Sequence, residues 1–163
     1  MKNWEEFYRK LHTYFNGIIA ISLLPFVFLF LELDTGEAVA AKVPDSWNTW
    51  LIILLTIPIA IILFITHRRS VLAIGQIDES TPLKDKLTRY LQIQTKRFLM
   101  MEVASVLCVA GLYFSNNYLF VFIYVFILFL FSLIRPAYDS IVRQLKLTKK
   151  ERAVIESKKD FEP

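Results

Sequence analysis

Residues 98–134 read FLMMEVASVLCVAGLYFSNNYLFVFIYVFILFLFSLI, which is two apolar runs separated only by the uncharged triplet Ser115-Asn116-Asn117. Each run is close to the length of about 20 apolar residues with which a helix crosses a hydrocarbon core of roughly 30 Å. A three-residue connection between two such helices predicts a tight antiparallel hairpin. The sequence therefore predicts an all-α, polytopic membrane protein that is built around this hairpin.

Two further apolar runs, residues 13–31 and 47–66, precede the hairpin. Tryptophan and tyrosine side chains prefer the depth at which the hydrocarbon core meets water, and several of them mark the ends of the predicted spans. The ones at the predicted outer edge are Trp47, Trp50, Tyr113 and Tyr118. The sequence therefore predicts four transmembrane helices over residues 13–31, 47–66, 98–114 and 118–134.

Basic residues are distributed unevenly among the polar segments that the four runs separate. Of the 19 Lys and Arg residues, 3 precede residue 13, 7 lie between residues 67 and 97, and 8 follow residue 134. The segment between the first two runs has only Lys42, and the hairpin triplet has none. Because Lys and Arg accumulate in cytoplasmic segments, we expect both termini in the cytoplasm. This orientation accounts for the basic excess without nucleic acid as a partner.

The second and third transmembrane helices are predicted to extend into the cytoplasm. Gly75 is the first strong stop signal after the second run. Thr81 and Pro82 are suited to the cap and first turn of a helix. No residue interrupts that helix before Ser115. We therefore expect both helices to project beyond the inner face of the membrane.

The last part of the chain contains two boundary signals. Pro136 is predicted to end or kink the fourth helix, because proline has no N–H and clashes with the preceding turn. Thr148 and Glu151 have the spacing of a capping box, which predicts a last short helix. We therefore divide the chain into a four-helix transmembrane domain, residues 1–147, and a cytoplasmic helix with a tail, residues 148–163.

Glu102 is the carboxylate that lies inside the third apolar run. Ionisable residues inside a membrane are costly, and they are candidates for a function by default. With the hairpin centred on Asn116, Arg135 lies about 7 Å closer to the cytoplasm than Glu102, at 1.5 Å per residue. The side chains of the two residues lean toward each other. We therefore predict a Glu102–Arg135 ion pair, and a proton-linked or substrate-linked role for Glu102 is the alternative.

The two histidines of the chain form a second candidate group with Asn16. His12 and Asn16 are one helical turn apart, and His67 ends the second run at a similar depth. Two imidazoles can bind a metal or one haem between helices, but a four-helix cytochrome with two haems needs four ligands. Arg68 and Arg69 would also repel a bound cation. We therefore predict interfacial histidines, with no metal and no cofactor.

Small residues form a stripe along the third run. They are spaced by four, three and four positions, which places them on one helical face: Ala104, Cys108, Gly111 and Ser115. Small side chains allow a neighbouring helix to approach closely, so we predict that this stripe is a packing seam. The fourth run instead has bulky aromatics spread around the helix, which predicts contact with lipid or with another protein: Phe120, Phe122, Tyr124, Phe126, Phe129 and Phe131.

The sequence contains no motif of a known catalytic site, such as a Gly-rich phosphate loop, paired cysteines or a His-Glu-x-x-His pattern. We therefore expect no catalysis. The protein is predicted to be an accessory or structural subunit, or an assembly partner, of a larger membrane complex. It would contact the lipid bilayer and other membrane protein chains or copies of itself. The alternative is a small oligomeric proton-coupled transporter or channel that uses Glu102. An enzyme acting on lipid headgroups would have to use His12, His67 and the neighbouring arginines, whose spacing does not support it.

The segment before the first run differs from a cleavable signal, because it contains Glu5 and Glu6 and no small-residue cleavage site follows the run. We therefore expect the first run to remain as an uncleaved span. Cys108 is the single cysteine, so the chain has no intrachain disulfide. The uncleaved first span and the compact loops favour a bacterial inner membrane as the location.

Overall fold

The computed structural model describes residues 3–35, 44–78 and 80–157, which form six helices and no strand. In chain order the helices are α1 (Trp4–Thr35), α2 (Asp45–Gly75), α3 (Leu83–Ser115), α4 (Tyr118–Ile134), α5 (Tyr138–Gln144) and α6 (Lys149–Glu156). The all-α prediction is confirmed. Parts of the predicted outer loop and tail, residues 36–43 and 158–163, lie outside the described residues.

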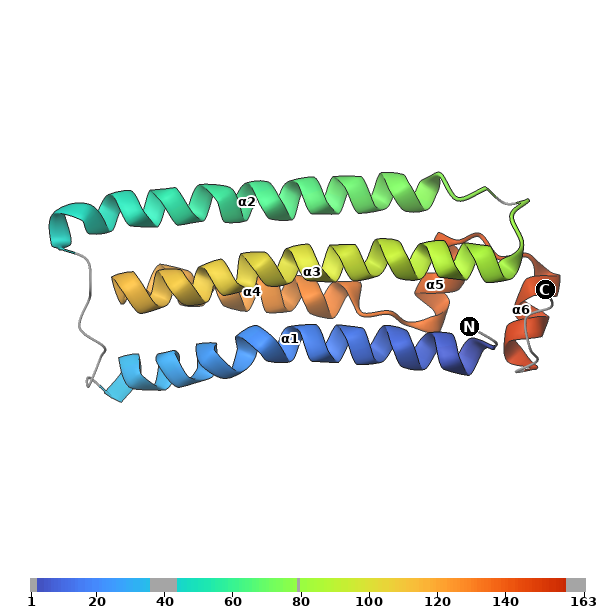
Figure 1. Cartoon of the computed structure of the whole chain (residues 1–163), viewed down its shortest axis with the longest axis horizontal. Coiled ribbons are helices and arrows are strands. Elements are labelled where there is room, and N and C mark those ends of the chain that lie inside the picture. The colour runs from blue at the N-terminus through green and yellow to red at the C-terminus, as the bar shows by residue number, and fades with distance from the viewer. Residues whose placement is uncertain (1–2, 36–43, 79, 158–163) are drawn as a thin grey trace.

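The central helix of the bundle is α3. It contacts α1, α2 and α4, and α1 and α2 lie on opposite sides of it (Figure 1). In the most apolar 18-residue window of each helix, 50% of the α3 residues are buried, compared with 17% for α1 and 6% for α2. The bundle is therefore organised around α3, and α2 is the helix with the most open surface.

Within the described residues, three helices, α1 to α3, are long and apolar enough to cross a membrane. Helix α4 with α5 makes a fourth candidate if the pair is counted as one bent span. Helix α4 has 17 residues, and α5 turns away from it by 75°. Pro136 lies in the break, so the prediction that it ends or kinks the fourth helix is confirmed. These helices indicate an integral membrane protein.

The long helices extend beyond the predicted spans. Helix α1 has 32 residues and begins at Trp4, before the predicted start at residue 13. Its first turns bury Phe7 and Leu11, whose four-residue spacing places them on the helical face that packs inward. Helix α2 ends at Gly75 as expected. Helix α3 has 33 residues and Pro82 as its cap residue, one position later than the predicted Thr81.

The hairpin turn uses two consecutive asparagines. Asn116 has a left-handed backbone conformation with φ of 48°, and its N–H donates to Leu112 O at 2.9 Å. Asparagine adopts this conformation more readily than most residues. Asn117 then caps α4, because its Oδ1 accepts a hydrogen bond from Leu119 N at 2.9 Å. The triplet therefore ends α3 and starts α4 with almost no intervening chain.

Aromatic rings fill the space between α1, α3 and α4. Phe26 and Tyr124 stack with their ring centroids 3.8 Å apart. Phe15 meets Phe98 edge to face at 5.1 Å and Phe131 at 6.1 Å. Such pairs add to the stabilisation that comes from the buried area alone. The aromatic core fixes α1 and α4 against the same side of the central helix.

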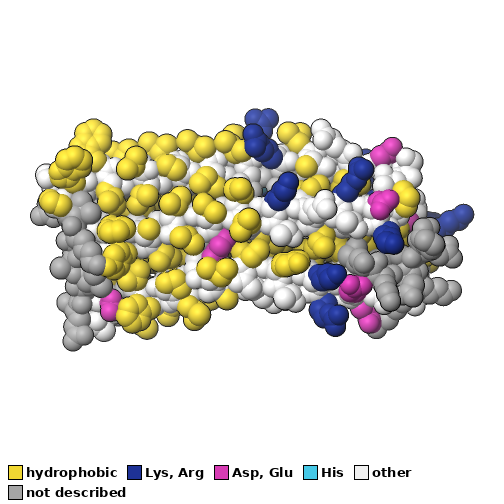
Figure 2. Space-filling view, viewed as in Figure 1, with side chains coloured by type: hydrophobic (Ala, Val, Ile, Leu, Met, Phe, Trp, Pro, Cys, Tyr) yellow, Lys and Arg dark blue, Asp and Glu magenta, His cyan; other side chains and the backbone are white. Residues whose placement is uncertain are grey.

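Charged side chains gather toward one end of the bundle, and hydrophobic side chains cover much of the rest (Figure 2). Helix α1 begins at this end, and α6 lies there (Figure 1). Thr148 Oγ1 accepts from Glu151 N at 3.3 Å, and Glu151 Oε2 accepts from Thr148 N at 2.7 Å. The predicted capping box at the start of α6 is therefore confirmed.

Candidate functional site

Glu102 lies in the middle of the bundle, with 5% of its surface exposed. Ser22 Oγ of α1 donates to Glu102 Oε2 at 3.1 Å and lies 3.1 Å from Tyr124 Oη of α4. Because a serine hydroxyl has one proton, donation to Glu102 makes Tyr124 the donor to Ser22. Glu102 Oε1 is buried without a hydrogen-bond partner. Residues of three helices therefore surround a carboxylate whose hydrogen-bond partner is a hydroxyl group and not a cation.

The structure does not bring Glu102 and Arg135 together. Arg135 is exposed directly after α4, and it lines a cleft with Arg97 and with residues of α2 and α5. Glu102 instead points toward Ser22 on α1. The rotation of α3 about its axis therefore separates the two side chains that were predicted to pair, although their heights along the hairpin were suitable.

His12, Asn16 and His67 do not form a common site. His12 is half-buried on α1, with its ring centroid 4.3 Å from that of Tyr8, and Asn16 is exposed. His67 is on α2, which lies on the other side of α3 (Figure 1). In the part of the chain that the structure describes, no group of three or more His, Cys, Asp or Glu residues is placed to hold a metal ion.

The stripe of small residues on α3 is buried along its length. Ala104, Cys108, Gly111 and Ser115 are all covered by neighbouring helices. A methyl group added to Gly111 would overlap the ring of Phe120 on α4. The absence of a side chain at this position therefore allows α4 to pack closely against α3 near the hairpin turn.

Arg97 is a buried charge that sequence reasoning counted only as part of a basic segment. It is 6% exposed, and its Nη2 lies 3.1 Å from Nδ1 of His67. Since guanidinium nitrogens only donate, His67 Nδ1 accepts in this contact. Arg97 Nε is buried without a partner. Nothing in the local sequence signals this burial, because it depends on the position of α2.

A third buried charge, Lys86, lies near the start of α3. Its Nζ is 2.7 Å from Glu151 Oε1, and the two side chains are 1% and 17% exposed. Burial alone would raise the pKa of Glu151, but hydrogen bonds from Lys86 and Thr148 outweigh it and hold the pKa below its ordinary value. This ion pair fastens α6 to the central helix.

No protein-family model, curated protein or solved structure matches this chain. Its function must therefore be inferred from its own geometry. Two buried groups on α3 are the candidates: the carboxylate of Glu102, which is closed among three helices, and the guanidinium of Arg97, which borders a cleft.

Proposed function

We propose that the chain crosses a bacterial inner membrane four times, with the start of α1 and α6 in the cytoplasm. The concentration of basic residues in the segments before residue 13, between residues 67 and 97, and after residue 134 supports this orientation. The position of α6 at the same end of the bundle as the start of α1 is consistent with it (Figure 1).

Thiol labelling tests this orientation, because the only native cysteine, Cys108, is 1% exposed. Exposed Thr35 and Ser157 are replaced singly by cysteine, and intact cells are treated with a membrane-impermeant maleimide. We expect labelling at position 35 and none at position 157 until the cells are opened. Labelling at position 157 in intact cells would contradict the proposed topology.

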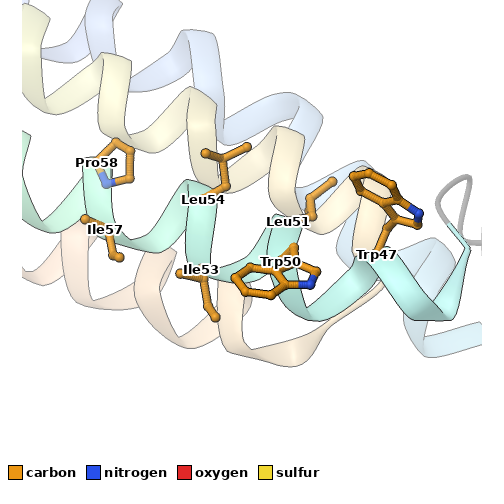
Figure 3. A pocket seen from close by; sticks show the side chains of 7 residues that line it. All are labelled: Trp47, Trp50, Leu51, Ile53, Leu54, Ile57 and Pro58. Atoms are coloured by element: carbon orange, nitrogen blue, oxygen red, sulfur yellow. The ribbon is translucent and has the colours of Figure 1, made fainter.

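Within this topology we propose that the protein is a non-catalytic accessory subunit or assembly partner of a larger membrane complex. The observation that supports this function is the outer face of α2. Leu54 and Trp50 are 71% and 68% exposed, and the face has a shallow apolar hollow of about 450 Å³ (Figure 3). All residues that line this hollow belong to α2: Trp47, Trp50, Leu51, Ile53, Leu54, Ile57 and Pro58.

A hollow bordered by two tryptophans can receive side chains of another transmembrane helix. Close packing between helices, and not the hydrophobic effect, drives association inside a membrane. Helix α4 offers a smaller outer surface than its composition suggests, because Phe120, Tyr124 and Phe131 pack inward and only part of its aromatic set is exposed. The partner is therefore proposed to pack on α2.

Photo-crosslinking with a matched control tests this proposal. A photoreactive residue replaces Leu54 on α2 or Leu24 on α1, which are 71% and 74% exposed on apolar helices. In native membranes we expect position 54 to give an adduct with another protein chain and position 24 to give mainly lipid adducts. Lipid adducts alone at position 54 would contradict the proposal, and a dimer-sized adduct would identify a second copy as the partner.

The alternative function is a small oligomeric proton-coupled transporter or channel. The observation that favours it is the buried Glu102, whose Oε2 continues into a chain of two hydroxyls, Ser22 and Tyr124. Proteoliposomes loaded with a pH-sensitive dye test it. This function predicts that Glu102→Gln abolishes proton flux. Glu32→Gln is the control, because it changes a carboxylate of α1 that is not part of the hydroxyl chain, and it should leave the flux unchanged. A wild-type protein that conducts no protons in any lipid mixture would argue against it.

A further inference from the structure

A cleft beside Arg97 has two parts of different chemistry. The polar part has a volume of about 280 Å³, and its polar lining residues come from α2, α3, α5 and the end of α4: His67, Tyr90, Arg97, Arg135, Ser140 and Gln144. The second part, of about 330 Å³, is lined mostly by apolar side chains of α2, α3 and α4, including Leu63, Phe64 and Met101. The two parts adjoin, because both are bordered by His67, Arg97, Leu130 and Ile134.

The polar part has an unbalanced positive charge. Among the described residues, its lining includes two arginines, Arg97 and Arg135, and no Asp or Glu. Arg97 is almost fully buried, and its Nη2 contacts the neutral acceptor His67 Nδ1, while Nε has no partner. A buried charge without a counter-ion is unfavourable, because it has lost its hydration. The site is therefore suited to an anion that can accept hydrogen bonds from a guanidinium.

The wall of the polar part is held by a hydrogen-bond chain. Tyr90 Oη donates to Gln144 Oε1 at 3.0 Å and accepts from Gln94 Nε2 at 2.9 Å. Gln144 contacts Tyr90 through Oε1, so this hydrogen bond uses neither of the two protons on its amide nitrogen. The chain joins α5 to α3, and it thereby positions the α5 side of the cleft relative to Arg97.

We propose that this cleft binds an anionic phospholipid, with its phosphate at Arg97 and Arg135 and an acyl chain in the adjoining apolar part. A guanidinium pairs well with phosphate because its donors match the phosphate oxygens. Arg97 directly precedes the apolar run that begins at Phe98, so the polar part lies where a headgroup would meet the hydrocarbon core. The apolar part favours a lipid over free phosphate, which has no group to place there.

Native mass spectrometry of the full chain in a mild detergent tests this proposal. The protein is incubated with phosphatidylglycerol or with phosphatidylcholine that has the same acyl chains. We expect one phosphatidylglycerol to be retained per chain. Phosphatidylcholine has the same phosphate, but its choline cation would lie near Arg97 and Arg135, so we expect it to be retained about tenfold less because of like-charge repulsion. Equal retention of both lipids would overturn the anionic specificity. Displacement of phosphatidylglycerol by millimolar inorganic phosphate would show that free phosphate is the ligand instead.

Variants of the cleft provide the residue-level test. Arg97→Gln and Arg135→Gln are expected to lower phosphatidylglycerol retention by about tenfold each. Arg89→Gln is the matched control, because Arg89 is an exposed arginine on the same helix. Leu130→Trp fills the border between the two parts and is expected to lower retention while both arginines remain. If Arg97→Gln fails to fold by gel filtration, wild-type retention by both Arg135→Gln and Leu130→Trp overturns the proposal.

Discussion

Glu102 and Arg97 are two nearly buried charged residues on the same helix, and their surroundings differ. Glu102 is enclosed by α1, α3 and α4, with a hydroxyl as its hydrogen-bond donor. Arg97 faces α2, contacts an imidazole and borders an open cleft. The exposed fractions of the two residues, 5% and 6%, are almost equal. The two sites therefore differ in whether a ligand can reach the charged group: the cleft leads to Arg97, whereas Glu102 is enclosed.

This difference follows from the chemistry of the two groups. A carboxyl group can lose its charge by binding a proton, so a closed site with two hydroxyls can accommodate it. A guanidinium keeps its charge at any physiological pH, so its site must offer an anion, a neutral acceptor or water. The closed site can therefore become neutral without a ligand, whereas the open site is the one where we propose that an anion binds.

Glu102→Arg is expected to have the largest effect. It places a group that cannot become neutral in the closed site, which should lower the free energy of unfolding by about 3–5 kcal/mol. Glu102→Gln keeps the shape of the side chain and serves as the control, with a much smaller loss expected. Thermal unfolding in detergent measures both variants. Equal stability of the Arg variant and wild type would show that the site is open to water.

Ser22→Ala tests the hydroxyl chain. It removes the donor to Glu102 and the partner of Tyr124, and leaving buried polar groups unsatisfied should lower the free energy of unfolding by about 1–3 kcal/mol. Adding Tyr124→Phe should recover part of this loss, because it removes one of the unsatisfied groups. Strictly additive losses in the double variant, measured by the same thermal unfolding, would contradict a coupled chain.

Arg97→Met is expected to change stability less, although its side chain is as buried as that of Glu102. Met conserves much of the apolar volume of the arginine side chain. His67 loses the hydrogen bond from Arg97, but it is exposed and can accept one from water instead. In lipid-free detergent the free energy of unfolding should fall by no more than about 1 kcal/mol, because the change also removes a buried charge that has no counter-ion. A loss as large as that of Glu102→Arg would show that the guanidinium is structural and would weaken the contrast between the two sites.

Protonation of Glu151 at acid pH should weaken the attachment of α6 to α3. We expect this effect to be smaller than those of the three substitutions above. The pKa of Glu151 in the folded protein lies below its ordinary value of 4.5, so its stabilising contribution is complete above that value. The contribution is lost as the pH falls through the lowered folded-state pKa. Spin labels are placed at exposed positions 89 and 157. With Glu151 intact, the distribution of the distance between them should broaden as the pH falls from neutral to about 3. Glu151→Gln should show the broad distribution throughout, and a narrow distribution in that variant would contradict the role of the ion pair.

Local signals predicted most of the helical framework. The Ser115-Asn116-Asn117 turn, the stop at Gly75 and the Thr148 capping box each depend on a few adjacent residues, and all three were readable. The apolar run predicted a span from residue 13 but did not indicate where α1 begins, because the first turns of α1 mix polar residues with apolar ones at helical spacing.

The candidate sites were harder to predict, because they depend on which helix lies against each face of α3. Height along the hairpin suggested Arg135 as the partner of Glu102, but a helix rotation placed the carboxylate against Ser22. Two other contacts join residues that are far apart in the sequence. His67 and Arg97 are 30 positions apart, and Lys86 and Glu151 are 65 positions apart. No motif links such pairs before the helices are placed.

The central position of α3 has a consequence for biogenesis. Within the described residues α1 and α2 pack on α3 and form no substantial contact with each other. The ribosome synthesises both helices before α3. Each of them is therefore in the bilayer without its packing partner until α3 has been made. A nascent chain truncated before Leu83 should therefore be a favoured substrate for membrane quality-control proteases, and resistance should arise only after Ser115 has left the exit tunnel.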